Sequence, residues 1–291
     1  MKLYRFLKAT KRLVMPKKAD SRRITCVDTG GERIAAMTYD DGPCGLVCSD
    51  GRTLTDFICD TLAEFGFTAT FNIIGTTAEN YPDSLGKGFE WSGKRYDHYP
   101  RFGEDNLGGA VNNTETIKRL LNGDNELANH GYRHIISGKM GYPYHNRFYF
   151  KTADEVIADY RRLHNFIYKN FGYKMTGARP PHYVDNLPSG ADIFDIYSQL
   201  NYNYYAASFD AGGWSSDDTA EAMIDRLERL LKKDPNALCG AIIYQKDGLS
   251  MSKTMPVVDA LPQQLAILAA YGYKIVSVKE LLNAKKYKNI D

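Results

Sequence analysis

The sequence predicts an α/β fold in which about seven parallel strands form a barrel surrounded by helices. From about residue 33 onward, short apolar stretches alternate with amphipathic ones, and this order is typical of a parallel sheet with helices outside it. About seven such units follow one another without a second domain boundary, which favours a barrel over an open sheet. The 291 residues, 43% hydrophobic and 25% charged, are enough for one large globular domain.

The strands are predicted from short apolar runs, several of which end in polar residues or a turn. "RIAAMTYDD" ends in two acids before a Gly-Pro turn, and "FTATFNII" is typical of a buried strand. The expected strands cover residues 33–41, 67–74, 126–131, 173–181, 202–210, 239–245 and 273–278.

The helices are predicted from apolar residues that repeat at helical spacing and from the capping residues around them. Thr152 is expected to cap the helix over 152–172, and Ser216 or Asp217 the helix over 216–233. The other expected helices cover residues 53–66, 113–123, 191–201 and 255–272.

Residues 1–32 form a basic segment that precedes the single domain expected over 33–291. The apolar side chains that would share one helical face are Leu3, Phe6, Leu7, Leu13 and Val14. Such an amphipathic helix lies on an anionic membrane surface or packs on its own domain. No apolar run is long enough for a signal peptide or a membrane span. We therefore expect a cytoplasmic or peripheral membrane location, with unconventional export as the alternative.

The net charge argues against a nucleic-acid partner, and the cysteine pattern argues against disulfides. The net charge of +2 is not the signature of a nucleic-acid-binding protein. The cysteines are odd in number and irregularly spaced, which argues against a disulfide framework. We expect free thiols at Cys26, Cys44, Cys48, Cys59 and Cys239.

Polar residues gather where the predicted strands end, and active sites lie at these ends in α/β folds. Asp40 and Asp41 follow the first strand, His130 and His134 the third, and Arg179 the fourth. The remaining strand-end residues are Pro180, Pro181, His182, Asp210, Trp214, Gln245 and Asp247.

Two histidines and one carboxylate make a three-ligand open site for Zn²⁺ or a similar ion. His130 and His134 are four residues apart, so one helical turn could aim both rings at one point. Asp40 and Asp41 would supply one ligand and one general base. Taken singly, each motif has an ordinary explanation as a turn or a coincidence, and it is their order along the chain that favours a site.

This order of motifs resembles the polysaccharide deacetylase family, the NodB-type carbohydrate esterases. "TYDDGP" is similar to the family's T-F-D-D-G-P, "HGYRH" to its H-x-x-x-H and "RPPHY" to its R-P-P-Y. "FDAGGW" resembles D-x-x-D-W, and "AIIYQ" the apolar strand that ends in L-x-H. The resemblance covers roughly residues 33–284 and implies a distorted (β/α) barrel with fewer than eight units.

The resemblance also implies a role for each matching residue. Asp41, His130 and His134 would bind the metal, which we expect to be Zn²⁺, with Co²⁺, Ni²⁺ or Mn²⁺ as alternatives. Asp40 would be the base and Arg179 would hold it ionised. The backbone N–H of His182 would stabilise the oxyanion. The resemblance further implies a supporting role for Asp210 in catalysis, and the residues expected to contact an acetylated carbohydrate are His182, Tyr183 and Trp214.

Three positions depart from the family pattern. His182 replaces an aromatic residue, Gly213 replaces the second acid of D-x-x-D-W, and Gln245 is expected to replace the general-acid histidine. Glutamine is not a titrating acid, so its presence there predicts a rate loss of roughly 10²–10⁴-fold for amide substrates.

Three hypotheses follow from these departures. The chain is a deacetylase of N- or O-acetylated sugars in which His182 lends the proton, or a catalytically weak or inactive pseudo-enzyme that binds carbohydrate. The third is a structural metal protein whose closed site includes Cys44. The insertion over 82–112 is either part of a substrate groove or a solvated loop.

Overall fold

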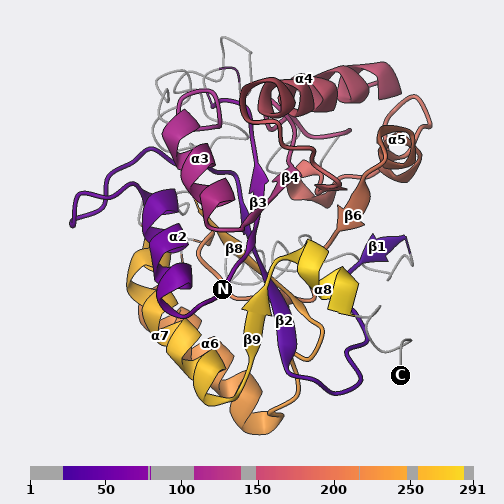
Figure 1. Cartoon of the computed structure of the whole chain (residues 1–291). Coiled ribbons are helices and arrows are strands. Elements are labelled where there is room, and N and C mark those ends of the chain that lie inside the picture. Colours follow the sequence, from indigo (N-terminus) through magenta and orange to yellow (C-terminus); the bar gives the residue numbers. More distant parts are fainter. Residues whose placement is uncertain are drawn as a thin grey trace, which may run out of the picture.

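The computed structural model describes residues 22–77, 79, 108–138, 149–215, 217–247 and 255–284. These residues form one sheet of nine strands in the order β1-β6-β5-β4-β3-β2-β8-β7, and β9 pairs with β2 beside this path (Figure 1). Every strand pair in the sheet is parallel. The prediction of a parallel α/β barrel-like fold is therefore confirmed.

The strands and helices alternate along the chain as the apolar pattern predicts. The strands are β1 (Arg23–Ile24), β2 (Ile34–Asp40), β3 (Thr70–Ile73), β4 (Glu126–Asn129), β5 (Gly177–Ala178), β6 (Asn203–Tyr205), β7 (Phe209–Asp210), β8 (Ile242–Lys246) and β9 (Lys274–Val276). The helices are α2 (Leu54–Glu64), α3 (Thr114–Asn122), α4 (Ala153–Phe171), η2 (Pro181–Tyr183), α5 (Ile193–Leu200), α6 (Ala220–Lys233), α7 (Pro256–Ala270) and α8 (Val278–Ala284).

Strand β2 is the centre of the sheet. Its residues Ala36–Asp40 pair with β8 along one edge, and the other edge pairs with β9 at its first residues and with β3 at its last. Six of its seven residues are buried, because helices cover the sheet and leave no solvated face. The strand count exceeds the predicted seven by two, because β1 precedes the predicted strands and the stretch predicted as one strand over 202–210 forms both β6 and β7.

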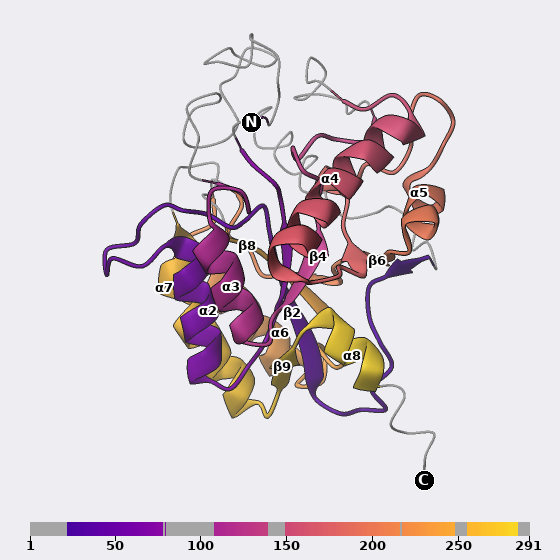
Figure 2. The same cartoon turned by 45° about the horizontal axis from the view of Figure 1, so that its top comes forward.

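The helices surround the strands on more than one side. Helices α2, α3, α6 and α7 gather on one side, and α4 and α5 lie on the other in both views (Figures 1 and 2). Each amphipathic helix turns its apolar residues to the sheet, as Val156, Tyr160 and Leu163 of α4 show by being fully buried. Because helices cover the sides of the sheet, polar side chains can gather at the carboxyl ends of the strands.

Helix boundaries test the predicted caps. Thr152 caps α4 in a capping box with Glu155, as expected. The cap of α6 is Thr219, so the expectation of Ser216 or Asp217 was wrong. Helix α8 was not expected at all.

The domain boundary at residue 33 is also corrected. Strand β1 pairs with β6, so residues 22–32 belong to the folded domain. The amphipathic segment over 1–21 and most of the insertion over 82–112 lie outside the described residues. Within the described part of the chain, no helix is both long and apolar enough to cross a membrane.

Candidate active site

Three neighbouring strands place polar residues on one rung of the sheet at their carboxyl ends. Asp40 of β2 is in register with Asn72 of β3 on one side and with Lys246 of β8 on the other. Residues in register point to the same face of a sheet. The rung therefore brings an amide, a carboxylate and an ammonium group to one place.

Asp40 is buried and held by two donors. Its Oδ1 accepts from Arg179 Nη1 at 2.6 Å and from Asn72 Nδ2 at 2.7 Å. Arg179 is fully buried, and it also donates to Thr38 Oγ1 at 3.0 Å and to the Tyr205 carbonyl at 3.1 Å. These bonds fix the carboxylate in one orientation, as expected for a positioned base.

Asp41, His130 and His134 converge on one point. Asp41 Oδ1 lies 3.1 Å from His130 Nε2 and 3.0 Å from His134 Nε2. One ligand atom from each residue lies within 4.8 Å of the others, which is compatible with a shared metal ion. The predicted ligands are thus brought together around one point beside Asp40.

The chemistry of His130 fits a bound cation. Its Nδ1 donates to the Arg179 carbonyl at 2.7 Å, since a carbonyl oxygen can only accept. In a neutral ring, Nε2 is then a bare acceptor, and it faces a carboxylate oxygen of Asp41. Two acceptors at this distance need a proton or a metal ion between them. A backbone carbonyl on the far nitrogen is also how metal-bound histidines are commonly oriented.

Charge at the site favours ionised Asp41. Burial opposes ionisation, but the charges of Lys246 and His134 and the hydrogen bonds from both histidines outweigh it, so the pKa of Asp41 lies well below its usual range. Burial lowers the pKa of His134, which keeps its ring neutral and able to bind metal. For His130, burial is outweighed by Asp40 and Asp41, and its pKa is raised.

Loops rather than a helix carry the convergent residues. Residues 131–134 are not helical, so the expectation that one helical turn aims both histidines was wrong. Four site residues have left-handed backbone: Asp41 with φ 79°, His134 with φ 54°, His182 with φ 56° and Tyr183 with φ 55°. This conformation is unusual for residues other than glycine.

The expected substrate-side residues lie around this centre. The His182 ring lies 5.5 Å from that of His134. Tyr183 packs near Arg179, whose Cζ is 5.8 Å from the tyrosine ring, and its hydroxyl accepts from the Ala207 N–H at 3.1 Å. Both residues of this turn therefore border the Asp40–Arg179 pair and the histidines.

Asp210 and Trp214 form a separate small unit. Trp214 Nε1 donates to Asp210 Oδ2 at 2.9 Å, and the Gly212 N–H donates to Oδ1 at 2.9 Å. Asp218 accepts from the N–H groups of Gly213 and Trp214 and so also holds this loop. Asp210 thus shapes the loop that presents Trp214.

Gln245 does not face the site. Its side chain is fully buried and its Nε2 donates to Gln264 Oε1 of α7 at 2.7 Å. Successive strand residues point to opposite faces, and the residue in register with Asp40 is the next one, Lys246. Lys246 Nζ lies 2.6 Å from Asp41 Oδ2. The structure therefore turns Gln245 away from the candidate site, contrary to the expectation that it lies there, and the residue of this strand that contacts Asp41 is Lys246.

Two further site residues were missed, although the sequence carried a signal for each. Asn72 lies near the end of the strand predicted over 67–74, and it bonds to Asp40. Asp247 was noted as a strand-end residue without a role. It is buried, accepts from Thr55 Oγ1 at 2.9 Å, and lies where any side chain at Gly42 would collide with it.

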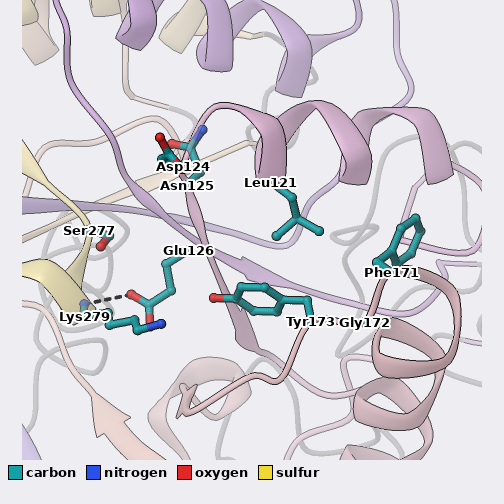
Figure 3. Close-up of a pocket in the computed structure, with 9 residues that line it drawn as sticks. All are labelled: Leu121, Asp124, Asn125, Glu126, Phe171, Gly172, Tyr173, Ser277 and Lys279. Carbon is teal, nitrogen blue, oxygen red and sulfur yellow. Dashed lines mark hydrogen bonds between the residues drawn. The ribbon is translucent and has the colours of Figure 1, made fainter.

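A cavity of about 360 Å³ lies at the opposite ends of the strands (Figure 3). Glu126, the first residue of β4, points into it, whereas Asn129 ends that strand near His130. The Glu126 carboxylate accepts from Thr70, Tyr205 and the Lys279 N–H. These bonds use its acceptor capacity in the fold, so the cavity has a structural rather than a catalytic character.

The chain is similar in sequence and in fold to known proteins. A peptidoglycan-N-acetylmuramic acid deacetylase, PdaC of Bacillus subtilis, is 24% identical over 257 residues, which are 88% of this chain and 40% of that protein. The chain thus spans about two fifths of the length of this curated relative. A solved structure of PdaC superposes with a TM-score of 0.57 and 23% identity, covering 90% of this chain and 96% of that chain.

A second solved structure shares the fold and carries a different description. BA3943 from Bacillus anthracis, described as a pseudoenzyme of carbohydrate esterase family 4, gives a TM-score of 0.56 at 16% identity, covering 87% of this chain and 66% of that chain. Residues 28–205 match the family described as Polysaccharide deacetylase, and this stretch includes Asp40, Asp41, both histidines and Arg179. The chain belongs to the polysaccharide deacetylase family.

Proposed function

We propose that this chain is a metal-dependent hydrolase that removes acetyl groups from an N- or O-acetylated carbohydrate. The observation that carries the proposal is the convergence of Asp41, His130 and His134 beside the buried Asp40–Arg179 pair. Family membership supports an acetylated polysaccharide as the substrate class. The name of the Bacillus subtilis relative supports peptidoglycan or its fragments as the first substrates to test.

The donor set suits Zn²⁺, with Co²⁺, Ni²⁺ and Mn²⁺ as alternatives. Asp41, His130 and His134 would hold the ion, which when bound polarises the acetyl carbonyl and activates water. Among the described residues, the cluster of possible ligands does not include Cys44. Three ligands leave coordination positions for water and substrate, which favours an open catalytic site over the closed structural site.

The chain's own residues supply the remaining chemistry. Asp40 takes a proton from the attacking water as the oxygen of that water bonds to the acetyl carbon, and Arg179 holds Asp40 in place. The backbone N–H of His182 donates to the oxyanion that forms. The carbon–nitrogen or carbon–oxygen bond then breaks, and the His182 ring, which lies 5.5 Å from the ring of His134, gives the leaving atom its proton.

The second candidate function is a catalytically weak or inactive protein that binds carbohydrate. Its support now comes from Lys246, because the strand end that faces Asp41 carries a lysine where the family pattern has a histidine. A structural neighbour described as a pseudoenzyme shows that this fold also occurs without that activity.

Acetate release decides between the two functions. The purified protein, loaded with Zn²⁺ or Co²⁺, is incubated with acetylated chito-oligosaccharides, peptidoglycan fragments and acetylated xylan, and metal content is measured in parallel. The hydrolase proposal predicts acetate release that falls by roughly 10²–10⁴-fold in Asp40→Asn while bound metal stays constant. Metal binding and sugar binding without any release that depends on Asp40 would establish the second function. The exposed variant Asp217→Asn is the matched control.

A further inference from the structure

The ammonium group of Lys246 contacts a proposed metal ligand, Asp41. Lys246 ends β8 on the rung of Asp40, and its Nζ lies 2.6 Å from Asp41 Oδ2. The two histidines face the other oxygen, Oδ1. One oxygen of the Asp41 carboxylate therefore contacts the ammonium group, and the other contacts the two imidazole rings.

Each of the two neighbouring carboxylates is paired with a cation. Asp40 is paired with Arg179, and Asp41 is paired with Lys246. Only about a quarter of the Lys246 side chain is exposed to water that could screen its charge. A divalent ion bound by Asp41 and the two histidines would place two positive charges beside the Lys246 ammonium group. Repulsion between charges a few ångströms apart is strong at a site of this burial.

We infer that Lys246 is a built-in competitor of the divalent ion for Asp41, and that it sets how tightly this site holds its metal. The inference rests on the metal site of the proposed function. A bound ion must share Asp41 with the ammonium group or displace it. Metal is therefore held more weakly than the same three ligands would hold it alone, and it exchanges more readily.

Removal of this charge tests the inference. Lys246→Met keeps an unbranched side chain that is one atom shorter and loses the ammonium group, and Lys246→Gln is a second neutral variant in case the first folds poorly. Lys274→Met is the matched control, because Lys274 forms an exposed pair with Glu280 at 2.8 Å elsewhere in the fold. Zn²⁺ affinity is measured by competition with a chelator, and Co²⁺ binding by its visible spectrum.

We expect both neutral variants to bind Zn²⁺ at least about tenfold more tightly than the parent and the control. Binding by Lys246→Met that His134→Gln then abolishes would locate the ion at this site. Equal or weaker affinity in the neutral variants overturns the inference and leaves the proposed metal site standing. If neither the parent nor the neutral variants bind a divalent ion, the metal site of the proposed function fails as well.

Discussion

Arg179 and Asp40 form a buried ion pair in which Nη1 and Oδ1 are 2.6 Å apart, and both side chains are almost wholly shielded from water. The same arginine presents its backbone carbonyl to His130 Nδ1. One residue therefore fixes both the proposed base and the tautomer of a proposed metal ligand. A displacement of Arg179 is therefore expected to disturb both the proposed base Asp40 and the proposed metal ligand His130.

Arg179→Met is expected to lower the free energy of unfolding by about 3–5 kcal/mol, because it leaves the Asp40 carboxylate buried without its cation. The double variant Arg179→Met/Asp40→Asn should recover part of this loss. Urea unfolding measures both, and Arg229→Met, in an exposed pair with Asp225, should cost at most about 1 kcal/mol. Equal losses for the buried and exposed arginines would contradict a tightly coupled pair.

His134→Gln is expected to lose bound metal. The substitution removes one of three ligand nitrogens or oxygens, so the affinity for Zn²⁺ should fall more than about 100-fold, beyond what loss of a supporting residue costs. Metal analysis after gel filtration gives the stoichiometry. His164→Gln is the control, because His164 lies on α4 and bonds to Tyr202 at 2.8 Å. Retention of metal by the His134 variant would refute the ligand assignment.

Gln245 is expected to matter for stability and not for catalysis. Gln245→Leu leaves Gln264 Oε1 buried without its donor, which should cost about 1–3 kcal/mol in unfolding free energy. The double variant Gln245→Leu/Gln264→Leu should restore much of this loss, since both polar partners are then gone. Rates of acetate release should stay within about twofold of the parent. A large gain in the rate of acetate release from Gln245→His would contradict this prediction and indicate that position 245 belongs to the active site.

Asp247 is expected to make stability depend on pH. Burial raises its pKa to about 7 from the usual 3.8, so between these values the folded state holds a proton that the unfolded state has lost. The contribution of Asp247 to stability is therefore most favourable at or below about pH 4, and it falls by about 4 kcal/mol at most as pH rises to 7 and above.

Asp247→Asn should remove this dependence, because the amide oxygen can still accept from Thr55 and carries no charge. Unfolding in urea at pH 5 and pH 8 compares the variant with the parent, with Asp217→Asn as an exposed control. The Asn variant should gain stability over the parent at pH 8 and little at pH 5. The same difference at both pH values would rule out titration of Asp247 in this range.

The parallel sheet, most helices and the convergence of Asp40, Asp41, His130, His134 and Arg179 were accessible from sequence. They were accessible because apolar runs alternate with amphipathic ones and because strand ends of a parallel sheet meet at one edge. The sequence could not tell whether Gln245 or Lys246 faces the site. Strand β8 is covered on both faces, so "AIIYQK" has no alternation of apolar and polar residues that would reveal which side chains face the site.

Local ambiguity explains the other errors. "SSDDT" offers five consecutive residues able to cap a helix, and only tertiary packing selects Thr219. The spacing of His130 and His134 suits a helical turn, but Gly131 between them adopts φ 83° and the chain continues as a loop. In both cases the sequence permits several local structures, and contacts with distant residues decide among them.

The left-handed backbone at Asp41, His134 and His182 has an evolutionary consequence. Each of these residues carries a conformational cost of about 1 kcal/mol that glycine would not. Mutational drift under selection for folding alone would therefore favour glycine at these three positions and erase the chemistry while strengthening the fold. A descendant of this chain that has lost its function should be recognisable by glycines at positions 41, 134 and 182.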